Sequence, residues 1–158
     1  MLRIGKLTDY ATLILCDMAY TATGLHTAVE IAGETGIALP TVSKILKLLH
    51  KAHIVTSTRG AKGGYQLATA AHNISIANII CAIEGPIALT ECLSSRENCD
   101  YTAHCSTRAN WSLINSAVNT ALQSVSLADM MKTNTMNSIR EIKIPVESIC
   151  HSRSDHNR

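Results

Sequence analysis

Three cysteines lie close together in the second half of the chain. Cys92, Cys99 and Cys105 are separated by six and by five residues, and no helical period of apolar residues runs between them. Three thiolates on one loop can converge on a single metal centre. Structural zinc sites usually take two ligands from a pair with two to four residues between its members. The wider spacing favours an iron–sulfur cluster, whose iron atoms accept thiolates from several directions.

Spacing alone leaves two other uses of this loop open, a zinc site and a thiol redox switch. The chain holds six cysteines in all. Cys16 and Cys81 fall in apolar helical patterns, so we expect both to be buried as small hydrophobic side chains. Cys150 lies in a polar tail and is expected to be incidental. The first residues lack the apolar core of a signal peptide, so we expect a cytoplasmic protein, in which disulfides are disfavoured.

The basic residues are concentrated in one acid-free segment. Between Thr35 and Ile83 there is no Asp or Glu, and the five basic residues there give this segment a charge of +5, against +2 for the whole chain. Such a block on a mildly acidic background is typical of a face that binds a polyanion. The residues are Lys44, Lys47, Lys51, Arg59 and Lys62.

Two short helices are predicted at the start of this segment. Thr27 and Glu30 form a capping box, and Pro40 suits the first turn of the next helix. Its inward positions are Val42, Ile45, Leu46, Leu49 and Ala52, and its outward positions are Thr41, Ser43, Lys44, Lys47 and Lys51. Two helices joined by a short turn, the second with a basic exposed face, are typical of a helix-turn-helix.

A β-hairpin is expected next. The stretches Ile54-Val55-Thr56-Ser57-Thr58 and Tyr65-Gln66-Leu67, the first rich in β-branched residues, flank a glycine-rich tip at 59–64. Arg59, Gly60 and Lys62 lie in this tip, which makes the hairpin resemble the wing of a winged helix. The glycines lack the Lys-Ser/Thr ending of a phosphate-binding loop. No nucleophile–base or acid–base motif was found elsewhere, so we expect no enzyme and no small-molecule substrate.

Three further helices complete the prediction. Thr8 or Asp9 is expected to cap the first helix, and Ser75 to cap a fourth that ends at Gly85-Pro86. A long helix begins near Thr107 and carries an apolar stripe too short for a free coiled coil. We expect it to form a homodimer, with packing on its own domain as the alternative. The stripe comprises Trp111, Ile114, Val118, Ala121 or Leu122, and Val125.

The expected fold is mainly α with a small β-hairpin wing, a winged helix-turn-helix followed by a long C-terminal dimerisation helix. The chain of 158 residues is 46% apolar, which suits one compact domain, and it has no apolar run long enough to span a membrane. We assign residues 1–86 to the DNA-binding domain, 87–106 to the cysteine loop, 107–132 to the dimerisation helix and 133–158 to a disordered tail.

The sequence resembles the Rrf-type winged-helix regulators that carry iron–sulfur clusters, which include the Isc regulator and the nitric-oxide-sensing Nsr repressor. The resemblance rests on Leu7-Thr8-Asp9-Tyr10-Ala11, on the wing Arg59-Gly60-Ala61-Lys62-Gly63-Gly64-Tyr65, and on the three cysteines followed by a long helix. Gly85-Pro86-Ile87-Ala88-Leu89-Thr90-Glu91-Cys92 and Val125-Ser126-Leu127-Ala128-Asp129-Met130 are most similar to the regulators of the SUF cluster-assembly system.

The resemblance implies a homodimer on operator DNA whose [2Fe–2S] or [4Fe–4S] cluster is held by Cys92, Cys99 and Cys105. Arg108 stands where the Isc regulator has its histidine ligand. Asp9 matches the acidic ligand that the Nsr branch takes from the partner subunit, with capping of the first helix as its alternative role, and His104 is a third candidate. A zinc-dependent or thiol-redox repressor, including a nitric-oxide-responsive one, is the alternative function.

The recognition helix is expected to place Thr41, Ser43 and Lys44 at base edges, with Lys47 and Lys51 at phosphates. Arg59 is expected in or beside the minor groove, with Gly60 and Lys62 at the backbone.

Overall fold

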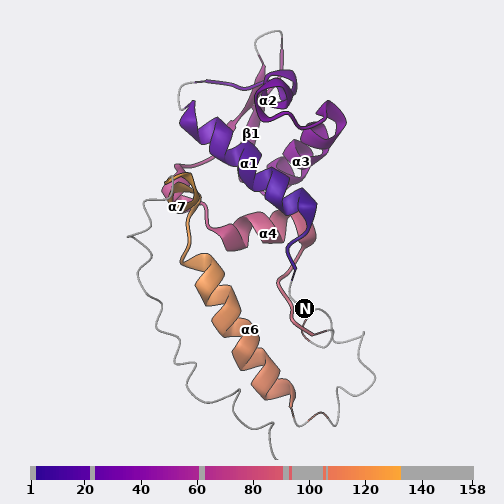
Figure 1. The fold of residues 1–158 in the computed structure, drawn as a ribbon, viewed down its shortest axis with the longest axis vertical. Helices are drawn as coiled ribbons and strands as arrows, with labels where there is room; N and C mark the ends of the chain where they lie inside the picture. Colours follow the sequence, from indigo (N-terminus) through magenta and orange to yellow (C-terminus); the bar gives the residue numbers. More distant parts are fainter. Residues whose placement is uncertain are drawn as a thin grey trace, which may run out of the picture.

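The computed structural model describes residues 3–21, 24–60, 63–90, 93, 105 and 107–132. Its elements follow one another as α1 (Lys6–Tyr20), α2 (Ala28–Thr35), α3 (Leu39–Lys51), β1 (Val55–Thr58), β2 (Gly64–Leu67), η1 (Ala71–Asn73), α4 (Ile76–Glu84), α6 (Arg108–Gln123) and α7 (Leu127–Met131). The predicted fold class is confirmed, because the described part is mainly helical with a two-stranded antiparallel hairpin. Helices α1 to α4 and the hairpin form one body, and α6 extends away from it (Figure 1).

The hydrophobic core lies where α1, α3 and α4 meet. Ile14 and Leu15 of α1, Ile45 of α3 and Ile79 of α4 are all fully buried. In α1 the buried Ala11, Ile14, Leu15 and Met18 recur at steps of three and four residues, which puts them on one face that the other helices cover. This packing fixes α3 against α1 and leaves its outer face open. The core also contains Val42, Leu46, Leu49, Ile31 and Leu127.

The start of α1 differs from the prediction that Thr8 or Asp9 caps it. The helix begins at Lys6, its N-cap residue is Gly5, and no side chain of the N-cap residue closes it. Thr8 is only 2% exposed, and Asp9 lies within the first turn. The predicted boundary was therefore wrong by a few residues.

The predicted capping box of α2 is confirmed. The Thr27 hydroxyl accepts from the Glu30 amide, and the Thr27 amide donates to the Glu30 carboxylate at 2.8 Å. The two groups satisfy each other's orphan hydrogen-bonding sites at the helix start. Ser75 likewise caps α4, paired with Asn78.

Helix α3 ends in a tight left-handed turn. The Ile54 amide donates to the Leu49 carbonyl and the His53 amide to the His50 carbonyl, both at 3.0 Å. These two bonds form a Schellman motif, which requires a left-handed residue at the second position past the helix. His53 takes that position with φ of 59°, and Ala52 becomes the C-cap residue. Ala52 is therefore exposed, and its prediction as an inward position was wrong.

The hairpin pairs Val55 with Leu67 and Thr58 with Gly64. A third stretch of backbone joins it, since His26 and Tyr65 exchange two amide–carbonyl hydrogen bonds, both of 2.8 Å. Gly64 permits this approach, because a Cβ there would lie 2.8 Å from the His26 carbonyl oxygen. The first residues of β2, next to the tip of the wing, are thus tied to the segment before α2.

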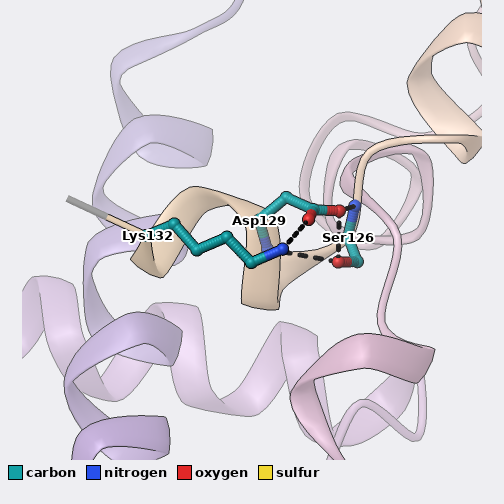
Figure 2. A network of polar contacts seen from close by, with 3 residues as sticks. All are labelled: Ser126, Asp129 and Lys132. Carbon is teal, nitrogen blue, oxygen red and sulfur yellow. Dashed lines mark hydrogen bonds and ion pairs between the residues drawn. The ribbon is translucent and has the colours of Figure 1, made fainter. Parts of the chain in front are cut away.

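Helix α7 returns to the body after α6. The Leu127 amide donates to the Ile74 carbonyl at 2.7 Å, and the Leu127 side chain is fully buried. Figure 2 shows the cap that starts α7, in which the Asp129 carboxylate accepts from Ser126 and from the Lys132 ammonium group at 2.7 Å. The bonds from Lys132 and Ser126 hold the pKa of Asp129 well below its usual range. In the described ranges, no helix is long and apolar enough to cross a membrane.

Candidate nucleic-acid interface and cysteine loop

The outer face of α3 carries the basic residues that the sequence assigned to DNA. Lys44, Lys47 and Lys51 are exposed, and Thr41 and Ser43 are half-buried beside them. The opposite face of the helix is fully buried in the core. A helix held in this way presents a fixed row of cations and short polar side chains, as an element that enters the major groove requires.

The hairpin places a second basic residue group at the end of the molecule away from α6 (Figure 1). Arg59 and Gly60 are exposed, and Gly60 adopts φ of 120°, a conformation that side chains disfavour. The Gly63 amide donates to the Gly60 carbonyl at 2.9 Å, which closes a tight turn. Lys62 lies outside the described residues.

His50 links α3 to the wing, a role that the sequence analysis missed. Its Nδ1 lies 3.2 Å from the Val55 carbonyl oxygen, and its Nε2 lies 3.3 Å from the Ser57 hydroxyl. A carbonyl only accepts, so Nδ1 carries the proton in this arrangement and Nε2 accepts from Ser57. The imidazole therefore bridges the last turn of α3 and strand β1. In the sequence, the only sign of this link was a histidine about one helical turn before the predicted strand.

Of the three loop cysteines, the structure describes Cys105, while Cys92, Cys99 and His104 lie outside the described residues. Cys105 stands just before α6, and its Sγ lies 3.4 Å from the Thr107 hydroxyl. Hydrogen bonds from Thr107, together with the neighbouring Arg108, lower the pKa of the Cys105 thiol. The thiolate is the form that binds metals and reacts with oxidants. Cys105 is thus suited to either use.

The cysteine loop is anchored to α6 by Asn115. Its side-chain oxygen accepts from the Leu89 amide at 3.0 Å, and its nitrogen donates to the Ile87 carbonyl at 3.1 Å. One amide side chain therefore holds two backbone groups of the segment that leads to Cys92. The sequence analysis missed Asn115, because the partners are 26 and 28 residues away along the chain.

Asp9 is exposed on α1. Its amide donates to the Gly5 carbonyl at 3.3 Å, whereas its carboxylate has no hydrogen-bond or ion-pair partner among the described residues. Its alternative role as the cap of α1 is excluded, because Gly5 occupies that position. An exposed carboxylate without a partner suits a ligand to a group held by another element. Within the described ranges, no three His, Cys, Asp or Glu side chains are grouped so as to hold a metal ion.

The two helical cysteines differ from each other. Cys16 is half-buried and packs against the core, and burial raises the pKa of its thiol. Cys81 is exposed on α4, so its predicted burial was wrong. The apolar period of α4 gave no sign that the face with Cys81 would lie uncovered.

Comparison with known proteins decides the family. The family described as "Rrf2: Iron-dependent Transcriptional regulator" matches residues 4–133. The chain belongs to the Rrf2 family. It is 35% identical over 132 residues to the protein rrf2 of Nitratidesulfovibrio vulgaris, which covers 83% of this chain and 88% of that protein.

Two further matches are described as regulators. The HTH-type transcriptional regulator IscR of Vibrio campbellii is 28% identical over 156 residues, covering 96% of this chain and 92% of that protein. Among solved structures, the global cysteine regulator CymR (YrzC) of B. subtilis matches with a TM-score of 0.65 and 29% identity over 85% of this chain and 100% of that one. This Rrf2 chain is therefore a winged-helix, DNA-binding transcription regulator.

Proposed function

We propose that this Rrf2 regulator senses iron–sulfur cluster status and controls genes of cluster assembly of the SUF or Isc type. The observation that carries the proposal is the Cys105 thiol, whose pKa is lowered at the junction of the cysteine loop and α6. A thiolate at that point ties any bound metal group to the element that follows the loop. The similarity to IscR over 96% of the chain supports a cluster as that group.

The ligands we assign are Cys92, Cys99 and Cys105, with Asp9 of a partner subunit as the fourth. A [2Fe–2S] or [4Fe–4S] cluster bound there would supply a centre that is sensitive to oxidants and to iron and sulfide supply. The protein would supply the thiolates that bind the cluster. A change in the position of the cysteine loop would then change the position of the elements packed against it. His104 is the other candidate for the fourth ligand.

We assign the reading of operator DNA to α3 and the wing. The exposed cations of α3 and the exposed Arg59 support this assignment. Short polar side chains would read base edges, whereas the lysines would neutralise phosphates. The assigned residues are Thr41, Ser43, Lys44, Lys47 and Lys51 on α3, and Arg59, Gly60 and Lys62 on the wing.

We further propose a homodimer formed through α6, working in the cytoplasm, where its DNA partner lies. Trp111 and Ile114 of the predicted stripe are 42% and 45% exposed, which is a large apolar surface within one helical turn. Leu122 and Val125 of the same stripe pack against the chain's own core. The first half of α6 is therefore the part that is available to a second copy.

A second candidate function is a repressor that responds through thiols, or through zinc, without a cluster. The similarity to the cysteine regulator CymR and the lowered pKa of Cys105 both favour it, because a low-pKa thiol is also the reactive kind.

The experiment that separates the two is a visible absorption spectrum of protein purified without oxygen. We expect sulfide-to-iron charge-transfer bands that are lost in Cys92→Ala, Cys99→Ala and Cys105→Ala. Cys81→Ala is the matched control, because Cys81 is an exposed cysteine outside the loop. Its spectrum should equal that of the wild type.

A colourless protein that still binds DNA would overturn the cluster proposal and favour the thiol or zinc repressor. Metal analysis of that protein then chooses between zinc and free thiols. Loss of colour in Cys81→Ala as well would show that the bands do not come from the assigned loop.

A further inference from the structure

The start of α1 is capped by a residue that is distant in the sequence. The Glu84 carboxylate accepts from the Gly5 amide at 2.8 Å and from the Thr8 hydroxyl at 2.5 Å, across 79 and 76 residues of sequence. Thr8 is 2% exposed, so its hydroxyl has no water to bond in place of Glu84. An anion at this point also interacts favourably with the positive end of the helix dipole. Glu84 thus does for α1 what an N-cap side chain does elsewhere.

The backbone is shaped to admit this carboxylate. Gly5 has no side chain, and a Cβ there would lie 2.9 Å from Glu84 Oε1. Such a contact is closer than carbon and oxygen atoms tolerate, so any larger residue at position 5 would displace the carboxylate. The contact between Glu84 and α1 therefore depends on three residues in two separate elements.

Glu84 occupies the boundary between the domain body and the cysteine loop. It is the last residue of α4, and Gly85 follows it with φ of 91°. The chain then runs to Ile87 and Leu89, which Asn115 holds against α6. The start of the loop is therefore fixed on one side to α6 and on the other to α1.

Helix α1 connects this point to the DNA-reading elements. Its inner face, with Ile14 and Leu15, belongs to the same core as Ile45 and Leu49 of α3. Packed interiors transmit small displacements because they have few voids to absorb them. Thr8 also precedes Asp9, the candidate ligand on α1, by one residue.

We propose that Glu84 is a positioning residue that couples the cysteine loop to the DNA-reading helices through Thr8 and Gly5. The inference rests on the proposed function, because it requires that cluster binding changes the position of the cysteine loop. A shift at the start of the loop moves the end of α4, and Glu84 carries that shift to the start of α1. Without the contact, the ends of α4 and α1 lose their direct link, and α4 acts on α1 through the core alone.

The test compares operator affinity of cluster-loaded and cluster-free protein at one salt concentration. Coupling between two sites typically changes affinity by roughly 5- to 150-fold, and we expect the wild type to fall in that range. Thr8→Val and Glu84→Ala should bring the ratio of the two affinities to within about twofold of one. Glu84→Gln keeps an acceptor oxygen and should retain most of the ratio.

Thr12→Val is the matched control. The Thr12 hydroxyl donates to the Thr8 carbonyl within the same helix at 3.0 Å, so its removal deletes a threonine hydroxyl from α1 without touching Glu84. Its affinity ratio should equal that of the wild type. Visible spectra of all variants should match, and equal melting temperatures of Thr8→Val and Thr12→Val would exclude a folding defect. If Thr8→Val and Glu84→Ala kept the wild-type ratio of the two operator affinities, Glu84 would act only as a helix cap, and the proposal would be overturned.

A second readout does not need the cluster. In cluster-free protein, amide hydrogen exchange at residues 85–89 should be faster in Thr8→Val and Glu84→Ala than in Thr12→Val. Equal exchange in the three variants would show that the contact does not hold the start of the loop. A wild-type protein without cysteine-dependent colour would instead overturn the proposed function, while the exchange comparison still decides the role of Glu84.

Discussion

Single residues decide what the exposed surface of this regulator can bind. Arg59 directly follows the first strand of the wing and is exposed, and the Gly60–Gly63 hydrogen bond after it closes a tight turn. A narrow tip with a planar cation suits the minor groove, where negative potential is concentrated over A·T-rich sequence. The α3 lysines that we assign to phosphates would hold the protein on DNA of any sequence.

Replacing Arg59 with Ala should weaken binding to a DNA fragment selected with the wild-type protein by about 1 to 3 kcal/mol, or roughly 5- to 150-fold. The loss reflects one specific contact, so it should exceed the loss on unrelated DNA. Fluorescence anisotropy at one salt concentration measures both.

Arg3→Ala is the control, since Arg3 is an exposed arginine three residues before α1 and far from the wing in the sequence. Equal losses in the two variants would mean that only total charge matters and would contradict the assignment of Arg59.

At the scale of elements, the ends of the helices set the geometry. Helix α3 stops in a Schellman motif, and strand β1 follows only one residue after the turn, at Val55. His50 then bridges the last turn of α3 to that strand. The recognition helix and the wing therefore form one rigid unit. The left-handed His53 is the point where this unit stores backbone strain.

His53→Gly should raise the free energy of unfolding by about 0.5 to 1 kcal/mol. A left-handed conformation costs a side-chain-bearing residue about 1 to 2 kcal/mol, and the greater freedom of unfolded glycine offsets about 0.5 to 1 kcal/mol of the gain. Urea denaturation measures the change.

His72→Gly provides the comparison, because His72 is exposed and has no positive φ. Glycine there should leave stability unchanged or lower it. A stabilisation of equal size at both positions would show that the backbone of His53 is not the cause.

For the whole molecule, α6 is the element that extends beyond the body (Figure 1). It has no buried residue of its own, although its last turn leads into the core through Val125 and Leu127. A helix this uncovered gains most of its stability from packing against something else. A second copy of α6, offering the same apolar surface, is the partner that we proposed above.

Ile114→Asp should raise the dimer dissociation constant at least about tenfold, because a charge in an apolar contact costs more than 1.4 kcal/mol. Sedimentation equilibrium measures it. Leu113→Asp adds the same charge at a residue that is 73% exposed and lies about 200° round the helix from Trp111, away from the stripe. Its dissociation constant should change less than about twofold. Dimers of equal strength in both variants would place the interface elsewhere.

The sequence by itself determined the features that depend on neighbouring residues. The capping box of Thr27 and Glu30, the apolar face of α3 and the glycine-rich hairpin all follow from interactions within a few positions along the chain. The family resemblance also followed from short motifs, and the Rrf2 match confirmed it. These features gave the fold class, the placement of the basic face and the cysteine loop.

Only the tertiary structure decided the contacts between distant parts. Glu84 closes α1, so the start of that helix could not be placed from the residues around Thr8. Asn115 and His50 act on backbone groups of other elements, which leave no periodic signal. Cys81 is exposed because none of the described elements covers its side of α4. In each case the deciding partner is brought near by packing of the core, and sequence spacing carries no information about that distance.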